Sequence, residues 1–302
     1  MARHTISVAV ATCRRPDALR TCLAALSAQT RAPDQLIVVD QGPVDATREV
    51  VEQCAFPVAY VKQPRRGLSA SRNRALEIAT GSVLAVTDDD CFPDSGWIEA
   101  IMATFETPEV TAVTGPVLPP GGKPPKDMCA LSLRPSRETR LFSSRVAPWR
   151  VGSGANLAAL CDILRELGGW DERLGVGSRG MAGEDVEILD RLLAAGGRIV
   201  YNGDALMHHA WQTRDRRRET RWSYGYGVGA LSGLRLAQRD AYGWRMLASY
   251  SKMHLRQLLR SARRGEWNAV REHVTSLSAL VPSLLYGLRV ASSPSRRPPE
   301  VL

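Results

Sequence analysis

The amino-acid sequence predicts an α/β fold: a mostly parallel sheet with helices on both faces, followed by a helical C-terminal extension. Apolar, β-branched runs alternate with helical patterns of about three turns through the first hundred residues, and from about Arg214 onward the pattern is purely helical. Strands that are apolar along their whole length are typical of a parallel sheet that helices cover from both sides. This alternation therefore predicts a doubly covered sheet.

Four strands are predicted in the first part, and a helical pattern follows each of them. They are "TISVAVA" (5–11), "QLIVVD" (35–40), "VAYVKQ" (58–63) and "SVLAVT" (82–87). Prolines and glycines in residues 119–147 predict an irregular excursion. Order returns with a Gly-rich loop (175–183), a helix in "EDVEILDRLLAAG" and a strand in "RIVYN". We therefore predict a catalytic domain at 1–212 and a helical, basic extension at 213–302.

Composition and charge narrow the functional classes. The six cysteines are scattered without a C-x-x-C pair, which favours reduced thiols over a disulfide frame, and no apolar run suits a signal peptide or a spanning helix. We therefore expect a cytoplasmic protein. Residues 201–302 hold 17 Lys and Arg against 7 Asp and Glu, whereas residues 1–200 hold 23 against 24. This asymmetry predicts an anionic partner for the C-terminal part.

The C-terminal helices leave two interpretations open. "WRMLASYSKMHLRQLLRSARR" places apolar residues among basic ones, namely Met246, Leu247, Tyr250, Leu255, Leu258 and Leu259. Such a helix either lies on a membrane surface or packs on the catalytic domain or on a second subunit. A cluster of arginines precedes it and either steers an anionic ligand, binds an acidic leaflet or forms a solvated helix face: Arg214, Arg216, Arg217, Arg218 and Arg221.

Three adjacent carboxylates, Asp88, Asp89 and Asp90, directly follow the fourth predicted strand. In a partly buried loop at least one of them is pushed toward protonation unless a cation compensates it. A hard divalent ion suits such a cluster, and a solvated turn before the next helix is the alternative. Because ligands sit at the carboxyl ends of parallel strands, we expect Thr12 to Arg15, Asp40 to Gly42 and these carboxylates to line one crevice.

A second acidic pair, Glu184 and Asp185, begins a predicted helix after the Gly-rich loop. The helix dipole favours the ionised form there, so such a carboxylate either accepts a proton from a hydroxyl nucleophile or simply caps the helix. His208 and His209 follow the strand in "RIVYN". We expect them to be structural or to add a metal or phosphate contact.

In order along the chain, five segments resemble family 2 glycosyltransferases with the GT-A fold, over roughly residues 5–212. They are "VAVATCRRPDAL", "QLIVVDQG", "RRGLSASRNRALEIATGSVLAVTDDDC", "GANLAALCDILRELGGWDERLG" and "GEDVEILDRLLAAGGRIVYN". The resemblance implies a Rossmann-like nucleotide-diphospho-sugar transferase that is inverting and depends on Mn²⁺ or Mg²⁺. The donor it implies is a nucleotide-diphosphate sugar, commonly a UDP-sugar.

The resemblance also implies roles for individual residues. Asp185, with Glu184 beside it, matches the catalytic base, and Asp88 and Asp90 match the D-x-D pair, Asp90 being the better metal ligand and His208 or His209 adding a contact. Nucleotide and donor contacts are implied for Ala11, Thr12, Arg14, Asp40, Gly67, Arg72, Asn73, Asp88, Asp89, Gly154, Ala155 and Asn156. The role of Asp89 stays unassigned.

Two departures from the family pattern shape the functional prediction. Gln41 and Pro43 replace the second acid and the serine of "V-D-D-G-S", so the nucleoside contact depends on Asp40. "RETRW" (218–222) has Arg218 at the glutamine position of the processive Q-x-x-R-W motif, which weakens a polymer-synthase interpretation. We therefore expect a single sugar transfer.

The remaining predictions concern partners and rival functions. We expect a nucleotide-sugar donor and a hydroxyl acceptor, which is a glycan, a lipid-linked compound or a small molecule. For the basic helices we expect peripheral contact with the anionic inner face of a membrane. A homodimer is the open alternative. Nucleic acid is not expected, since the basic segment lacks aromatic interleaving. The rivals are a non-catalytic basic module that binds anionic lipid or nucleic acid through residues 214–264, and a sugar nucleotidyltransferase. The latter should have a Gly-rich loop where this chain has "TCRRPD".

Overall fold

The computed structural model describes residues 4–43, 46–64 and 67–296. Arg65 and Arg66, which begin one of the quoted segments, lie outside the described residues. The chain forms two compact units, one of Met1–Arg66, Ala70–Gly169 and Ile188–Trp211, the other of Gly67–Ser69, Trp170–Glu187 and Gln212–Leu302. Residues 67–69 and 170–187 thus group with the C-terminal helices, a feature that the predicted division at residue 212 does not contain.

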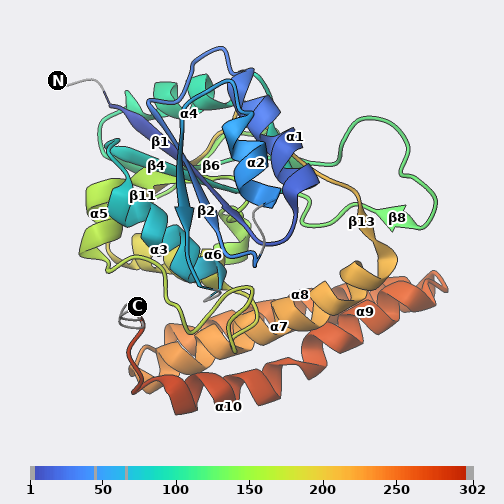
Figure 1. The fold of residues 1–302 in the computed structure, drawn as a ribbon. Helices are drawn as coiled ribbons and strands as arrows, with labels where there is room; N and C mark the ends of the chain where they lie inside the picture. The colour runs from blue at the N-terminus through green and yellow to red at the C-terminus, as the bar shows by residue number, and fades with distance from the viewer. Residues whose placement is uncertain (1–3, 44–45, 65–66, 297–302) are drawn as a thin grey trace. The chain divides into compact units, whose positions relative to one another are not determined.

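The first unit is built on a mixed sheet of eight strands in the order β3-β2-β1-β4-β10-β6-β11-β9 (Figure 1). The four predicted strands are β1 (Ile6–Thr12), β2 (Gln35–Asp40), β3 (Val58–Lys62) and β4 (Val83–Asp88), all mutually parallel. The other half holds β10 (Leu157–Leu160), which runs antiparallel between β4 and β6 (Val110–Thr114), then β11 (Arg198–Tyr201) parallel to β6, and β9 (Arg140–Phe142) antiparallel at the edge. The predicted α/β class is confirmed.

Smaller elements complete this unit. Its helices are α1 (Pro16–Ser27), α2 (Ala46–Glu52), α4 (Trp97–Phe105) and α5 (Cys161–Glu166), with most of α3 (Leu68–Ile78) and of α6 (Glu184–Ala194), and a short 3-10 turn at Pro148–Arg150. A second small sheet has the order β5 (Cys91–Pro93), β12 (Met207–His209) and β7 (Val117–Leu118). The excursion predicted at 119–147 carries β8 (Met128–Cys129) and the edge strand β9.

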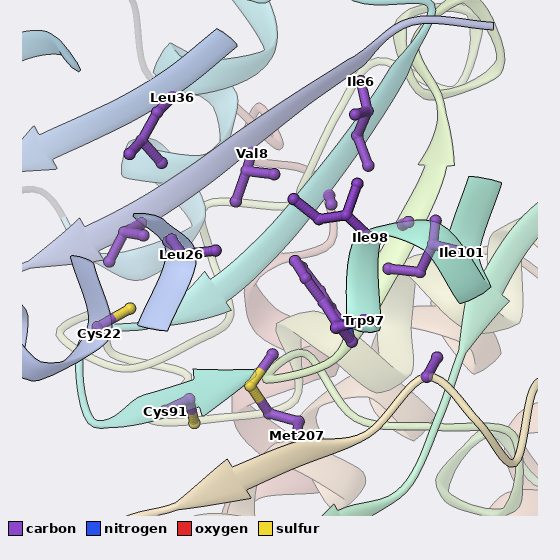
Figure 2. Close-up of a cluster of buried hydrophobic side chains, with 14 of the residues drawn as sticks. Ile6, Val8, Cys22, Leu26, Leu36, Cys91, Trp97, Ile98, Ile101 and Met207 are labelled. Atoms are coloured by element: carbon purple, nitrogen blue, oxygen red, sulfur yellow. The ribbon is translucent and has the colours of Figure 1, made fainter. Parts of the chain in front are cut away.

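The core of the first unit explains why the apolar runs become strands. Ile6 and Val8 of β1 lie in one cluster with Leu26 of α1 and Trp97 and Ile98 of α4 (Figure 2). On the other face of the sheet Ala9, Ile37 and Val39 are at most 3% exposed. Both faces are therefore covered, as the unbroken apolar character of these strands predicts.

The second unit consists mainly of helices α7 (Arg214–Ala237), α8 (Tyr242–Arg263), α9 (Trp267–Ser278) and α10 (Leu280–Val290), preceded by β13 (Gln212–Thr213). The Thr213 hydroxyl caps α7 by accepting a hydrogen bond from the Arg216 amide at 3.1 Å. α9 ends just before α10 begins, and Pro282 stands in the first turn of α10, where a proline is tolerated. Within the described part of the chain, no helix is long and apolar enough to cross a membrane.

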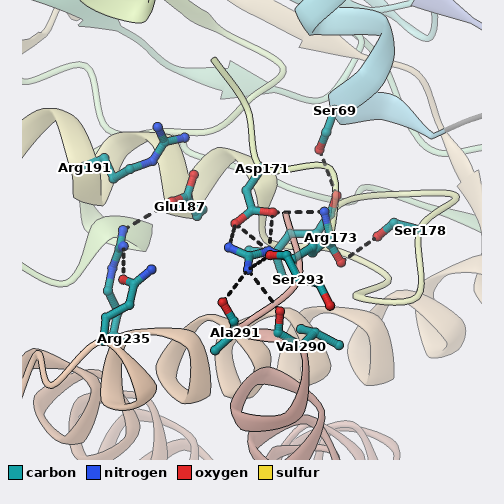
Figure 3. Close-up of polar contacts among 12 residues, drawn as sticks. Ser69, Asp171, Arg173, Ser178, Glu187, Arg191, Arg235, Val290, Ala291 and Ser293 are labelled. Atoms are coloured by element: carbon teal, nitrogen blue, oxygen red, sulfur yellow. Dashed lines mark hydrogen bonds and ion pairs between the residues drawn. The ribbon is translucent and has the colours of Figure 1, made fainter. Parts of the chain in front are cut away.

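The segment 170–187 is tied to the end of α10 through Arg173 (Figure 3). Its guanidinium donates to the carbonyls of Val290, Ala291 and Ser293 at 2.8–3.2 Å and pairs with Asp171 at 2.6 Å. These carbonyls belong to the last turn of a helix and the residues after it, which have no partner within the helix itself. Arg173 therefore satisfies them and holds the loop to the helix.

Candidate active site

Three of the predicted segments meet at one edge of the first unit's sheet. In the register of the parallel strands Thr12 lies opposite Asp40, and Ala11 lies opposite Asp88. All four residues stand at the carboxyl ends of β1, β2 and β4, the neighbouring strands at the centre of that half of the sheet. These segments therefore share one edge of the sheet, and that they line one crevice stays a prediction.

Asp89 is the most buried member of the acidic triplet, with a side chain 0% exposed. It accepts a hydrogen bond from the Thr12 hydroxyl at 2.7 Å and pairs with the Arg15 guanidinium at 2.7 Å. The pKa of Asp89 is raised to about 7, chiefly by burial; Arg15 and Thr12 oppose the shift, and Asp90 and Asp88 add to it. The middle carboxylate therefore fastens the first loop to the fourth strand.

Asp90 uses its two carboxylate oxygens on different partners. Oδ2 accepts a hydrogen bond from Arg15 at 2.7 Å, and Oδ1 lies 3.7 Å from Nε2 of His209. Nδ1 of His209 is 2.9 Å from the carbonyl oxygen of Ala210, which can only accept, so Nδ1 carries a proton and Nε2 is the ring nitrogen that faces Asp90. A carboxylate oxygen and a ring nitrogen thus face each other across a short gap.

This gap fits a divalent cation. Asp90, His209 and the buried Cys91 each offer one atom, and the three atoms lie within 4.8 Å of one another. A thiol is a soft ligand, whereas Mn²⁺ and Mg²⁺ prefer oxygen ligands, so Cys91 is the least suited of the three. Asp90 and His209 are therefore the fitting pair, and Asp88, the other member of the predicted D-x-D pair, is not part of this three-atom cluster.

Asp88, the third carboxylate, is compensated separately. It pairs with the Arg72 guanidinium at 3.2 Å, and Arg72 also donates to the carbonyl oxygen of Gly154 at 3.0 Å. The Arg72 side chain is only 3% exposed, whereas that of Asp88 is 27% exposed. Arg72 of α3 thus links the end of β4 to the loop before β10, and Asp88 keeps an accessible carboxylate.

Asp40 lies at the end of β2 with its carboxylate directed into the protein. Oδ1 accepts from the Gly42 amide at 2.7 Å, and Oδ2 accepts from the Tyr60 hydroxyl at 2.9 Å and from the Lys62 ammonium at 2.8 Å. The side chain is 0% exposed. A nucleoside contact by Asp40 would therefore replace one of these hydrogen bonds.

Two residues expected to shape the donor pocket lie in the interior. The amide of Asn156, 1% exposed, accepts from the Trp97 indole and donates to the carbonyls of Pro116 and Ala205 at 2.7–3.0 Å. The Ala155 carbonyl accepts from the Thr87 hydroxyl at 2.8 Å. In this structure both residues position the loop that carries Gly154, and neither side chain reaches the carboxylates.

The remaining residues predicted to contact the donor or the metal do not gather at one place. Arg14 is exposed and has φ +61°, and Asn73 is buried in α3. His208 points to the other face of β12 from His209: its ring stacks on Phe92 with centroids 6.1 Å apart. Gly67, with φ +100°, lies in the second unit, and the Leu68 amide beside it donates to the Val176 carbonyl at 2.8 Å.

Glu184 and Asp185 begin α6 in the second unit. Glu184 is 6% exposed, and its carboxylate packs against Gly175, whose φ of +100° bends the loop toward it. Asp185 is half-buried, and its Oδ1 accepts from the Val186 amide at 2.8 Å. Of the pair, Asp185 is the carboxylate that solvent reaches.

Arg15 is the functional residue that the sequence reasoning missed. It bridges Asp89 and Asp90 although its own side chain is 49% exposed. Burial alone lowers the pKa of Arg15, but Asp90, Asp89 and Asp88 together raise it above the ordinary value. The available signal was the requirement for a cation beside three carboxylates, because Arg14 and Arg15 stand in the loop that shares their edge.

Comparison with known proteins decides the family. The family described as Glycosyl transferase family 2 matches residues 7–168. The chain belongs to glycosyltransferase family 2. It is 28% identical over 217 residues to a glucosyl-dolichyl phosphate glucuronosyltransferase of Haloferax volcanii, covering 68% of each chain. It is 30% identical over 215 residues to the succinoglycan biosynthesis protein ExoM of Rhizobium meliloti, covering 67% of this chain and 66% of that protein.

Solved structures agree on the fold. A Pyrobaculum calidifontis mannosyltransferase in complex with GDP-Man and Mn²⁺ superposes with a TM-score of 0.62 at 16% identity, covering 97% of this chain and 89% of that one. TarS 1-349 of S. aureus superposes with a TM-score of 0.55 at 16% identity, covering 94% and 92%. The predicted GT-A fold and the predicted glycosyltransferase class are confirmed.

Proposed function

We propose that this family 2 glycosyltransferase moves one sugar from a UDP-sugar to an acceptor hydroxyl with inversion, with Mn²⁺ or Mg²⁺ at the acidic triplet. The observation that carries the metal assignment is the facing pair of possible ligand atoms, Asp90 Oδ1 and His209 Nε2, 3.7 Å apart. Support for the donor comes from structural neighbours: the mannosyltransferase holds GDP-Man and Mn²⁺, and GalNAc-T7, with a TM-score of 0.57, holds UDP, GalNAc and Mn²⁺.

Asp90, His209 and Asp88 would hold the ion. When bound, it would supply Lewis-acid stabilisation of the negative charge that develops on the leaving diphosphate. Arg15 and Asp89 keep Asp90 in place: Arg15 fixes Oδ2 of Asp90 and leaves Oδ1 directed at His209. Arg72 likewise orients Asp88. These residues form the donor half of the proposed site.

Asp185 is the proposed general base. In a single displacement, its carboxylate accepts the proton of the acceptor hydroxyl while the hydroxyl oxygen attacks the anomeric carbon from the side opposite the diphosphate, and the C1 configuration inverts. Asp185 lies in the first turn of α6 and is only half-buried, so solvent and a substrate hydroxyl can reach its carboxylate. Glu184 is buried against Gly175 and serves the packing of the loop.

The base assignment is tested with two neighbouring variants. We expect Asp185→Asn to lower the transfer rate by about 10³-fold while donor binding, measured by calorimetry with Mn²⁺, stays near wild type. Glu184→Gln is the matched control, and we expect it to lower thermal stability more than the turnover of the folded enzyme. Near-normal turnover of Asp185→Asn would overturn the assignment.

The donor and the acceptor are tested by substrate panels. Slow hydrolysis of UDP-sugars and GDP-sugars with Mn²⁺ or Mg²⁺ identifies the donor, and anomeric analysis of the product tests inversion. We propose a glycan or lipid-linked acceptor in preference to a small molecule, because relatives include a glucosyl-dolichyl phosphate glucuronosyltransferase and an O-antigen chain rhamnosyltransferase of Salmonella anatum. Product length distinguishes single transfer from polymerisation.

A further inference from the structure

Helix α8 carries two exposed stripes side by side, one apolar and one basic. Trp244, Leu255 and Leu259 are 62%, 50% and 54% exposed. On an α-helix these positions lie within about 60° of one another, because each residue adds about 100°. These three side chains therefore form a single line on the solvent side of the helix, whereas Met253, 37% exposed, lies apart from it on the far side of the basic residues.

The basic stripe borders this line along the helix. On the same helical projection, with Trp244 placed at about 100° around the axis, the basic residues fall between roughly 180° and 260°. They are Arg245, Lys252, Arg256, Arg260 and Arg263, and all are exposed. Helix α8 contains no Asp or Glu. Among the residues that the structure describes, none forms an ion pair with these five cations, so their charge is directed to the surroundings.

The cations of α7 differ in this respect. Arg217 and Arg221 both pair with Glu272 of α9 at 2.8–3.0 Å, Arg216 pairs with Glu219, and Arg218 pairs with Asp215. Four of the five arginines at 214–221 are thus paired inside the second unit. Among the described residues of the C-terminal part, the largest group of cations without an ion pair lies on α8.

The opposite side of α8 is already occupied. Met246, Tyr250 and His254 are 1%, 5% and 7% exposed and face the other helices of the unit. The apolar residues that looked like one set in the sequence therefore form two faces. One is buried against the other helices, and the other leaves about half of the Leu255 and Leu259 side chains exposed.

We propose that the outer face of α8 docks on a bilayer that contains anionic phospholipids, with the helix lying parallel to the surface. The apolar stripe enters the boundary between headgroups and acyl chains, and the flanking Arg and Lys side chains extend their ammonium and guanidinium groups to lipid phosphates. Trp244 near the start of α8 suits the interface, where an indole keeps one polar edge in water.

A second copy of the chain is the poorer occupant. A two-fold contact through this face would set five cations against five identical cations, and the helix has no carboxylate to separate them. Anionic lipid supplies the missing negative charge and an apolar layer at the same time. The charge pattern therefore selects the membrane surface.

Vesicle flotation tests the proposal with the full-length protein. We expect flotation with vesicles of equal parts phosphatidylglycerol and phosphatidylcholine, little flotation with phosphatidylcholine alone, and partial loss in high salt, which screens the basic stripe. Leu255→Ser with Leu259→Ser should weaken binding about tenfold or more at low salt. Arg256→Gln with Arg260→Gln should weaken binding and remove most of its salt dependence.

Leu133→Ser with Leu141→Ser is the matched control, because these leucines are 42% and 49% exposed in the first unit. This control should float like the wild type, and circular dichroism checks that each variant is folded. Equal flotation of the Leu255 and Leu259 variant would overturn the proposal. So would a dimer that this variant abolishes, or oligonucleotide binding without flotation. Flotation requires no sugar transfer, so its failure leaves the proposed enzymatic function untouched.

Discussion

At the scale of single residues, the three carboxylates of the acidic triplet lie in three different environments. Asp89 is buried on Thr12 and Arg15, Asp90 faces His209, and Asp88 lies beside Arg72 with its carboxylate partly accessible. Three adjacent carboxylates are tolerated because each has its own hydrogen-bond or cation partner. The two outer residues are therefore placed to meet a ligand, and the middle one is placed to hold the loop.

This division predicts opposite outcomes for neighbouring substitutions. We expect Asp90→Ala to remove the Mn²⁺-dependent part of UDP binding, because the metal would lose its main carboxylate ligand. Asp89→Asn should retain metal-dependent binding but lower the melting temperature, because Arg15 keeps only Asp90 as a partner and the buried contact with Thr12 loses a carboxylate acceptor. Titration calorimetry with and without Mn²⁺, with thermal melts, checks both. Full metal-dependent UDP binding by Asp90→Ala would contradict the ligand assignment.

Asn156 gives a second test, between a structural role and a contact with the donor. Its amide satisfies the Trp97 indole and two backbone carbonyls in the interior, so Asn156→Ala leaves three buried polar groups without this partner. We expect a loss of roughly 2–5 kcal/mol in the free energy of unfolding, measured by urea titration. The exposed Asn268→Ala is the control. A variant of normal stability that binds UDP-sugar poorly would instead make Asn156 a donor contact.

At the scale of elements, the C-terminal helices are held together by small residues. Gly225, Gly229 and Gly233 recur every fourth residue of α7, and a Cβ at each would meet backbone atoms of α9 or α10. Gly287 of α10 faces α7 in the same way. Close backbone approach therefore replaces the side-chain interdigitation that larger residues would need.

We expect Gly233→Ala to destabilise the protein by about 1–3 kcal/mol, because the added methyl group falls on the Leu284 carbonyl and on the Gly287 Cα, neither of which moves without shifting α10. Gly121→Ala is the matched control, since nothing lies within 4 Å of its Cβ position. Urea unfolding monitored by circular dichroism measures the difference. Equal stability of the two variants would show that α7 and α10 can move apart without loss of folding free energy.

The contact between α8 and α9 contains a pH-sensitive pair. Nδ1 of His254 lies 3.1 Å from Nδ1 of His273, an arrangement that needs one neutral ring as the acceptor. Burial, then His273 and Arg221, lower the pKa of His254 to about 4, and burial and Arg221 lower that of His273. Tyr250, Arg217 and Glu272 are the other titratable or charged groups around the pair.

The sign of the stability change follows from these lowered pKa values. The unfolded chain binds a proton at His254 near pH 6.5 and the folded chain does so only near 4, with the pKa of His273 lowered in the same direction, so stability is present above 6.5 and falls as the pH drops toward 4. We expect a loss of roughly 2–3 kcal/mol across this window. His254→Gln should flatten the dependence, whereas His4→Gln should retain it. Urea titrations across the window measure it.

At the scale of the whole molecule, the sequence predicted the alternating strands and helices but not the directions in which individual side chains point. The strands and the D-x-D position could be predicted because apolar periodicity and the order of motifs are visible in the sequence alone. The separation of His208 from His209, the inward turn of Asn156 and the two faces of α8 follow from packing that only the folded chain defines. Residues 170–187 group with distant helices for the same reason.

The distribution of charge over the whole chain predicts that metal removal separates activity from stability. Because Arg15 and Arg72 already pair with all three carboxylates, we expect the fold not to require a divalent ion as a counter-charge. We therefore expect chelation with EDTA to abolish sugar transfer while the melting temperature falls by no more than about 3 °C, and Mn²⁺ to restore activity. Parallel calorimetry and activity assays measure both. A cooperative loss of structure on chelation would mean that the carboxylates repel one another despite their arginine partners, and that the ion is part of the fold.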